Sequence, residues 1–186
     1  MESWRITLLF TFMILVANVP DAQAESSAEE FGLEIPEQCS SLSICDNIPN
    51  YPQQQAKKAV ARLRDKGILS DETPKDTRRG GRIEDNIELC AMDVKTFIPE
   101  ASVDAQGKWH VVLNPKGNPI QKFQVEMCKR EKSPCAAFVV FAPGKKGACI
   151  QNYVYNPMRV LHTDGSTSNK LLRLPSTCSC VAQPAG

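Results

Sequence analysis

The sequence predicts a small, all-β, disulfide-rich fold built from long β-hairpins, preceded by a partly disordered segment with one short helix. Two observations support this class. The chain of 186 residues contains eight cysteines. Its second half alternates apolar and polar residues between clusters of turn-forming residues, which is typical of hairpins. Six of the eight cysteines lie in that half, so crosslinks are expected to supplement a small core.

Residues 1–24 have the features of a secretory signal peptide. Arg5 gives the start a positive charge, residues 6–19 form an apolar run, and small residues precede a cleavage site after Ala24. The run is shorter than the roughly 20 apolar residues of a membrane span. We therefore expect a secreted, extracellular protein without a membrane span, and in an oxidising compartment an even number of cysteines indicates disulfide bonds.

Charge gives little information about partners. Residues 25–82 hold nine basic and ten acidic residues, a net −1, and residues 83–186 hold twelve and nine, a net +3. This balance is too weak to make nucleic acid or another polyanion an expected partner.

Residues 25–38 are acidic, contain few apolar side chains and are expected to be disordered. Cys39 and Cys45 follow, close enough in sequence for a local disulfide bond; a bond between two copies of the chain is the alternative. The spacing of Ala56, Val60 and Leu63 then predicts an amphipathic helix over residues 52–66. One short helix cannot form a core alone, so we expect it to cover the C-terminal half.

We expect residues 70–82 to form an exposed linker, because they are polar and contain proline and paired glycines. Arg79 and Arg82 have the Arg-x-x-Arg spacing that processing proteases favour. We predict cleavage after Arg82, with Arg79 as the alternative. The chain then divides into a signal peptide (1–24), a pro-segment (25–82), a disulfide-rich domain (83–182) and a tail (183–186).

Apolar and polar side chains alternate with a period of two residues in the C-terminal half, which predicts two hairpins there. The first joins a strand over residues 108–114 to one over residues 120–128, with Ile120 out of phase and suggesting a bulge. The second joins residues 150–161 to residues 170–174.

Cys178 and Cys180 share one face of an extended segment, so they cannot comfortably pair with each other and each must reach a distant cysteine. The candidates are Cys90, Cys128, Cys135 and Cys149. If Cys128 pairs with Cys178 and Cys135 with Cys180, a small ring closes and the remaining pair can pass through it, forming a cystine knot. A loop-entropy model gives about 4 kcal/mol per bond. We therefore expect the bridges, more than an apolar core, to hold this domain.

The ordered cysteines resemble the neurotrophin-type cystine knots and, within them, the Spätzle family of arthropod Toll ligands. The matching stretches are residues 109–114, 134–135, 149–153 and 174–180. The resemblance implies a neurotrophin-like cystine knot with the pairs Cys90–Cys149, Cys128–Cys178 and Cys135–Cys180.

The same resemblance implies an inactive precursor, activation by a clip-domain serine protease, and a homodimer that engages the leucine-rich-repeat ectodomain of a Toll receptor. Thr177 stands where Spätzle typically has the cysteine that links protomers. The dimer is therefore expected to be non-covalent.

We interpret the protein as a secreted cytokine of the Toll signalling pathway, in innate immunity or dorsoventral patterning. A neurotrophic growth factor and a coagulogen-like clotting protein are the alternatives. No enzyme activity is expected, because His162, Asp164 and Ser166 lie within one tight turn and catalytic triads converge from separate segments. No cofactor is expected, and no metal site either, because Cys178 and Cys180 are expected to form disulfide bonds in an exported protein. Trp109, Tyr153 and Tyr155 are the candidate receptor or dimer contacts.

Overall fold

The computed structural model describes residues 28–69 and 87–185. The expected signal peptide with Ala24, and the linker with Arg79 and Arg82, lie outside these residues. We call residues 28–69 the N-terminal segment and residues 87–185 the C-terminal domain. Within the described ranges, no helix is long and apolar enough to cross a membrane.

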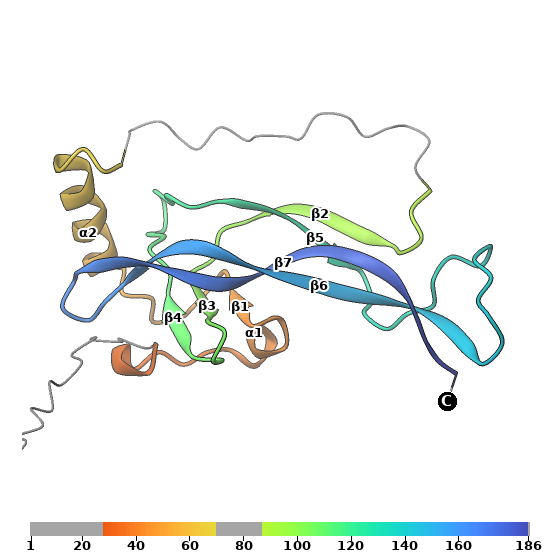
Figure 1. Cartoon of the computed structure of the whole chain (residues 1–186). Coiled ribbons are helices and arrows are strands. Elements are labelled where there is room, and N and C mark those ends of the chain that lie inside the picture. The colour runs from red at the N-terminus through yellow and green to blue at the C-terminus, as the bar shows by residue number, and fades with distance from the viewer. Residues whose placement is uncertain (1–27, 70–86, 186) are drawn as a thin grey trace, which may run out of the picture.

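A long twisted hairpin forms the spine of the C-terminal domain (Figure 1). Strand β6 (Lys145–Leu161) pairs antiparallel with β7 (Thr167–Pro184), with one register shift between Gln151 and Tyr153. Gly165 lies in the turn with a φ of 79°, a conformation that glycine adopts without steric cost. The second predicted hairpin is therefore confirmed, and it extends well beyond the predicted ends.

The first predicted hairpin was wrong in its pairing. Strand β4 (Trp109–Val111) pairs with β3 (Ala101–Val103), and β5 (Phe123–Cys128) pairs with β2 (Met92–Phe97).

The side chain of Asn114 explains this difference. Its Oδ1 accepts hydrogen bonds from the backbone amides of Ile120 and Gln121, at 3.1 and 2.8 Å, and its Nδ2 donates to the Pro99 carbonyl at 2.7 Å. These bonds hold the connection as a closed loop, so each strand meets a partner from earlier in the chain. Ile120 lies in this loop, before β5 begins, and the predicted bulge there was wrong.

The N-terminal segment is more structured than its composition suggests. It contains a 3-10 turn, η1 (Ala28–Phe31), helix α1 (Glu37–Leu42), strand β1 (Ile44–Cys45) and helix α2 (Gln53–Asp65). The predicted helix is confirmed as α2. The expectation of a single helix was wrong, and so was that of disorder over the described residues 28–38, where Ala28 and Leu33 are buried.

Two apolar clusters fill the interior. The shared cluster draws on both parts of the chain: Ala28, Leu33, Cys39, Cys45, Ile48, Tyr51, Ala56, Ala59, Val60, Leu63, Ala101, Val111, Leu113 and Leu161. The second cluster belongs mainly to the C-terminal domain: Ile44, Phe97, Val112, Val125, Met158, Val160, Leu172 and Leu174. An apolar core therefore accompanies the disulfide bonds, and the larger share of the bonds in holding the domain stays a prediction.

Candidate functional site at the knot and under the N-terminal segment

Three disulfide bonds gather toward the end of the β6–β7 hairpin that lies opposite its turn. They join Cys90 to Cys149, Cys128 to Cys178 and Cys135 to Cys180, with Cα–Cα distances of 5.7, 5.1 and 5.7 Å. These are the pairs that the resemblance implies. The Cys135 sulfur lies within 4.8 Å of both sulfurs of the Cys90–Cys149 bond. Each of these sulfurs is committed to a disulfide bond, so the group is a crosslink and not a metal site.

A buried amide holds β5 against the hairpin beside the knot. The Gln151 side-chain oxygen accepts a hydrogen bond from the Cys128 amide at 2.9 Å, and its nitrogen donates to the carbonyls of Glu126 and Thr177 at 3.0 and 3.2 Å. The nitrogen also donates to the Asn152 carbonyl at 3.0 Å, so this side chain bonds four backbone groups and fixes the position of Cys128. Sequence reasoning assigned no role to Gln151, because β6 carries other polar residues, among them Asn152 and Asn156, and no local pattern distinguishes this one.

The fourth disulfide bond lies in the N-terminal segment. Cys39 on α1 is joined to Cys45 on β1, with a Cα–Cα distance of 5.0 Å. This is the local pairing, in preference to a bond between two copies. No described cysteine remains free.

Strand β1 adds the N-terminal segment to a sheet of the C-terminal domain (Figure 1). Ile44 lies opposite Ser102, and Cys45 lies opposite Ala101, in the order β1-β3-β4. Beside this pairing, the amide of Glu100 donates to the Cys45 carbonyl at 2.7 Å. The two parts therefore share backbone hydrogen bonds as well as apolar contacts.

Buried polar groups also join the two parts. The Glu100 carboxylate accepts a hydrogen bond from the Ile48 amide at 2.6 Å. The Tyr51 hydroxyl donates to the Val112 carbonyl and accepts from the Asn114 amide, both at 2.8 Å. Burial raises the pKa of both the Glu100 carboxyl and the Tyr51 phenol. Because a buried group without a partner is costly, these bonds specify one docking arrangement.

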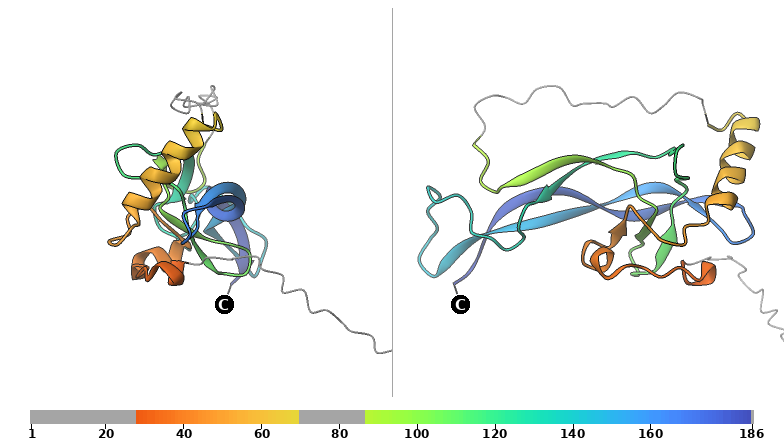
Figure 2. Two further views of the ribbon diagram at one scale, coloured as in Figure 1. Left: turned by 90° about the vertical axis from the view of Figure 1, so that its left-hand side faces the viewer. Right: turned by 180° about the vertical axis from the view of Figure 1, so that it is seen from behind.

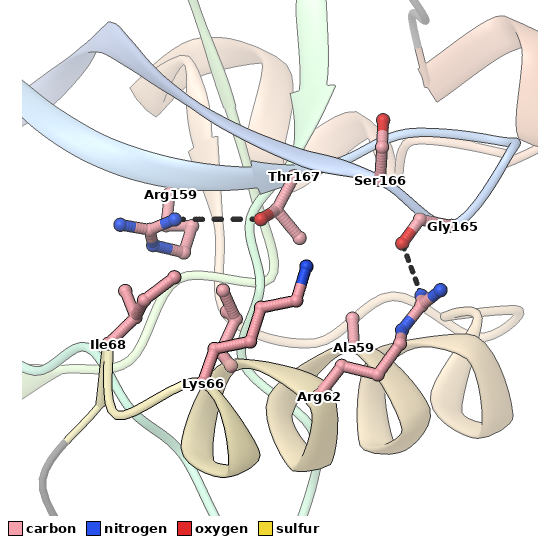
Figure 3. Close-up of a pocket in the computed structure, with 9 residues that line it drawn as sticks. Ala59, Arg62, Lys66, Ile68, Arg159, Gly165, Ser166 and Thr167 are labelled. Atoms are coloured by element: carbon pink, nitrogen blue, oxygen red, sulfur yellow. Dashed lines mark hydrogen bonds between the residues drawn. The ribbon is translucent and has the colours of Figure 1, made fainter.

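Helix α2 lies beside the turn of the β6–β7 hairpin (Figure 2). Its apolar face, centred on Val60 and Leu63, packs into the shared cluster with Val111 and Leu161. The Arg62 guanidinium donates to the carbonyl of Gly165 in the hairpin turn (Figure 3). The N-terminal segment thus covers apolar surface of the C-terminal domain.

The structure brings two of the three candidate contact residues together. Trp109 and Tyr155 line a surface pocket of about 290 Å³, together with Arg173 and α1-side residues that include Ser43. Trp109 packs against the shared cluster, while Tyr155 is 49% exposed. The Arg173 guanidinium donates to the Ser43 hydroxyl at 3.1 Å, so this pocket lies at the edge of the N-terminal segment.

Tyr153 lies two residues before Tyr155 on β6. The Arg173 guanidinium stacks on its ring, 3.8 Å from the centroid. Burial raises the pKa of the Tyr153 phenol, an effect that the nearby Arg173 charge opposes. Arg173 therefore connects the surroundings of all three aromatic residues, and sequence reasoning missed it.

The three residues of the hairpin turn do not form a triad. His162 Nε2 lies 2.8 Å from the hydroxyl of Ser168 on β7. The Asp164 carboxylate accepts a hydrogen bond from the Ser166 amide at 2.7 Å, which stabilises the turn. These contacts account for the residues as parts of the hairpin.

Comparison with known proteins identifies the family. The sequence model described as Spaetzle matches residues 87–182. Among solved structures, the chain resembles the crystal structure of the Spätzle cystine knot, with 22% identity over 54% of this chain and 97% of that chain, at a TM-score of 0.33. No curated protein sequence matches. Because the family model covers half of the chain, including every cysteine of the knot, the chain belongs to the Spätzle family.

Proposed function

We propose that this protein is a secreted cystine-knot cytokine, activated by proteolysis, that binds and activates a Toll receptor. The observation that carries the proposal is the membership of residues 87–182 in the Spätzle family. In this role the C-terminal domain engages the leucine-rich-repeat ectodomain of the receptor, in innate immunity or dorsoventral patterning.

The N-terminal segment acts as the pro-segment in this proposal. It covers apolar surface around Val111 and Leu161, which are part of the shared cluster. A clip-domain serine protease cuts after Arg82, or after Arg79. The cut removes the covalent tether, so the covering contact becomes bimolecular and loses its high effective concentration. The receptor then competes for the surface with a detachable segment.

The active ligand is proposed to be a non-covalent homodimer. Each cysteine of the C-terminal domain is bonded within the chain, so none remains there to link two copies. The pocket formed by Trp109 and Tyr155 is the candidate receptor or dimer contact, with Tyr153 beside it. Trp and Tyr are favoured at such contacts because they bury a large area.

The test is the double variant Arg79→Ala with Arg82→Ala. After treatment with a trypsin-like cascade protease, the wild-type chain should bind a Toll ectodomain and activate a Toll reporter cell, whereas the variant should do neither. Lys75→Ala, a charge change elsewhere in the same linker, is the matched control and should behave as the wild type. Full signalling by the uncleavable variant would sink the proposal.

Light scattering after cleavage separates this function from the clotting alternative. A ligand should remain a soluble dimer after the cut, whereas a coagulogen-like protein should gel. Gel formation without receptor binding would therefore favour the coagulogen-like clotting function.

A further inference from the structure

A surface pocket of about 350 Å³ lies between α2 and the β6–β7 hairpin (Figure 3). It is formed by both parts of the chain. Helix α2 and the residues after it contribute one wall and the hairpin the other, and the lining consists of Ala59, Arg62, Leu63, Lys66, Ile68, Arg159, Gly165, Ser166 and Thr167. This volume is in the lower range of small-molecule sites.

Three cationic side chains line this pocket, and no carboxylate does. Arg62 and Lys66 come from the N-terminal segment, while Arg159 comes from β6 of the C-terminal domain. In Figure 3 the Lys66 ammonium reaches from α2 toward the hairpin and lies, in that view, between the two arginines. Asp164 lines the neighbouring pocket with Arg62, and its carboxylate accepts a hydrogen bond from the Ser166 amide.

The helix end alone does not explain this arrangement. Basic residues in the last turn of a helix or at its C-cap interact favourably with its dipole, which accounts for a cation at Arg62 or at the C-cap residue Lys66. However, like charges four residues apart on one helix repel each other. Arg159 adds a third positive charge from a different element. A bound anion would relieve the repulsion among all three.

The pocket also supplies hydrogen-bond donors. Arg159 donates through Nη1 to the Thr167 Oγ1 at 3.5 Å, so the Thr167 hydroxyl keeps its own hydrogen for another acceptor. The apolar side chains of Leu63 and Ile68 lie beside the charged groups. Two guanidinium groups, an ammonium group and a hydroxyl suit the oxygens of a sulfate or phosphate group, because guanidinium binds such oxyanions with more than one donor.

The geometry points to an oxyanion site that bridges the N-terminal segment and the C-terminal domain, and that takes a sulfate or phosphate group carried on a larger extracellular ligand, such as a sulfated oligosaccharide. A ligand that binds only when both walls are present stabilises the docked arrangement in proportion to its binding. The site therefore couples anion binding to retention of the N-terminal segment. It goes beyond the proposed function and is present in the uncut chain.

Calorimetry on the uncut secreted chain tests this site, with inorganic sulfate, inorganic phosphate and a heparin-derived hexasaccharide as separate probes. The hexasaccharide should bind one per chain. Lys66→Gln and Arg159→Gln should each weaken its binding by about three- to fivefold, as expected for the loss of one exposed ion pair. Comparable binding of an inorganic ion would identify the free ion as the ligand of the same site.

Lys57→Gln and Lys145→Gln are the matched controls. They remove the same charge from α2 and from β6, at exposed positions outside the pocket lining. Both should leave binding unchanged. Hydrogen exchange gives a second readout: the hexasaccharide should slow exchange in α2 of the wild type, and less so in Arg159→Gln, which lies on the other wall. Equal losses in the controls and the pocket variants, or no binding of any probe, would overturn the inference.

Discussion

The Tyr51 phenol shows how a single residue docks the N-terminal segment. Its hydroxyl is both donor and acceptor, toward the backbone of Val112 and Asn114. The side chain is buried in the shared cluster, so water does not replace a lost partner easily. Apolar packing alone would tolerate small shifts of this segment, whereas the two hydrogen bonds fix it in place.

Tyr51→Phe should therefore destabilise the folded chain by about 1–3 kcal/mol, because two buried hydrogen bonds of the Tyr51 hydroxyl are lost, each worth roughly 0.5–1.5 kcal/mol. The Val112 carbonyl and the Asn114 amide keep the 2.9 Å bond to each other. Urea unfolding of the uncut protein measures the change. Tyr155→Phe is the control, since Tyr155 is half exposed and its hydroxyl has no comparable buried role. Equal stabilities for the two variants would contradict this account.

His162 gives the stability a pH dependence. Burial lowers its pKa below the ordinary value of 6.5, and the nearby Asp164 charge opposes this effect only in part. The unfolded chain therefore takes up a proton that the folded chain resists. The folded state loses stability as the pH falls through 6.5 toward the lowered pKa.

His162→Gln should remove that contribution while keeping a side chain that reaches Ser168. Between about pH 7.5 and about pH 5, the wild type should lose more unfolding free energy than the variant. Denaturant titrations of both proteins across this pH range measure the difference between their unfolding free energies. The other titrating groups are the same in both proteins, so their contributions cancel in this difference. Parallel curves would show that His162 does not contribute.

At the scale of elements, β6 approaches the loop before it most closely at Gly147. A Cβ built there would lie 2.3 Å from the Phe141 ring and 2.8 Å from the Cys135 sulfur. No real Cβ makes such contacts, so a side chain at this position must displace the ring or the bridge. Glycine at position 147 is thus a condition for bringing the Cys135–Cys180 bond to the hairpin.

Gly147→Ala should lower the yield of correctly bridged protein, and Gly147→Ala with Phe141→Leu should recover part of it, because the larger of the two obstructions is removed. Non-reducing peptide mapping gives the fraction of each protein with all four bonds. Gly117→Ala is an informative comparison, since Gly117 has open space around it but a φ of 83°. The Gly117→Ala substitution should lower the free energy of unfolding and leave the fraction of protein with all four disulfide bonds unchanged.

The elements that the sequence predicts well are those with a local signal. The β6–β7 hairpin has a turn with Asp164 and Gly165 between apolar runs, and α2 has a regular apolar face. Strand β2 lacks such a signal, because most of its side chains are exposed and do not alternate. Its partner β5 lies far along the chain, and no local pattern specifies that pairing.

The docking of the N-terminal segment was beyond sequence reasoning for a related reason. Leu33, Ile44, Ile48 and Tyr51 are irregularly spaced, and each is buried against residues distant in sequence. Composition therefore suggested disorder over residues 25–38, whose described part has the 3-10 turn η1 and the start of helix α1. The candidate contact Trp109 was predicted, but its neighbour Arg173 was not, because a lone arginine in a strand gives no indication of what it will stack on.

For the whole molecule, the shared cluster predicts what happens when the two parts separate. Removal of the N-terminal segment after cleavage should expose Ala101, Val111, Leu113 and Leu161. The separated C-terminal domain should then bind the apolar dye ANS more strongly than the uncut chain does and should be less soluble without a partner. Fluorescence titration before and after separation measures this. An unchanged dye signal would mean that the domain refolds over the vacated surface.

The disulfide bonds of the C-terminal domain gather toward one end of the β6–β7 hairpin, and the shared cluster lies toward the other. A mild reductant would therefore break the bonds at one end of the β6–β7 hairpin, and a mild detergent would disrupt the apolar contacts at the other. The fold can therefore be lost from either end of the hairpin. Loss of the disulfide bonds leaves the shared cluster to hold its half, and loss of the shared cluster leaves the bonds to hold theirs. Assays of the protein's durability should therefore use both a reductant and a detergent, since resistance to one says little about resistance to the other.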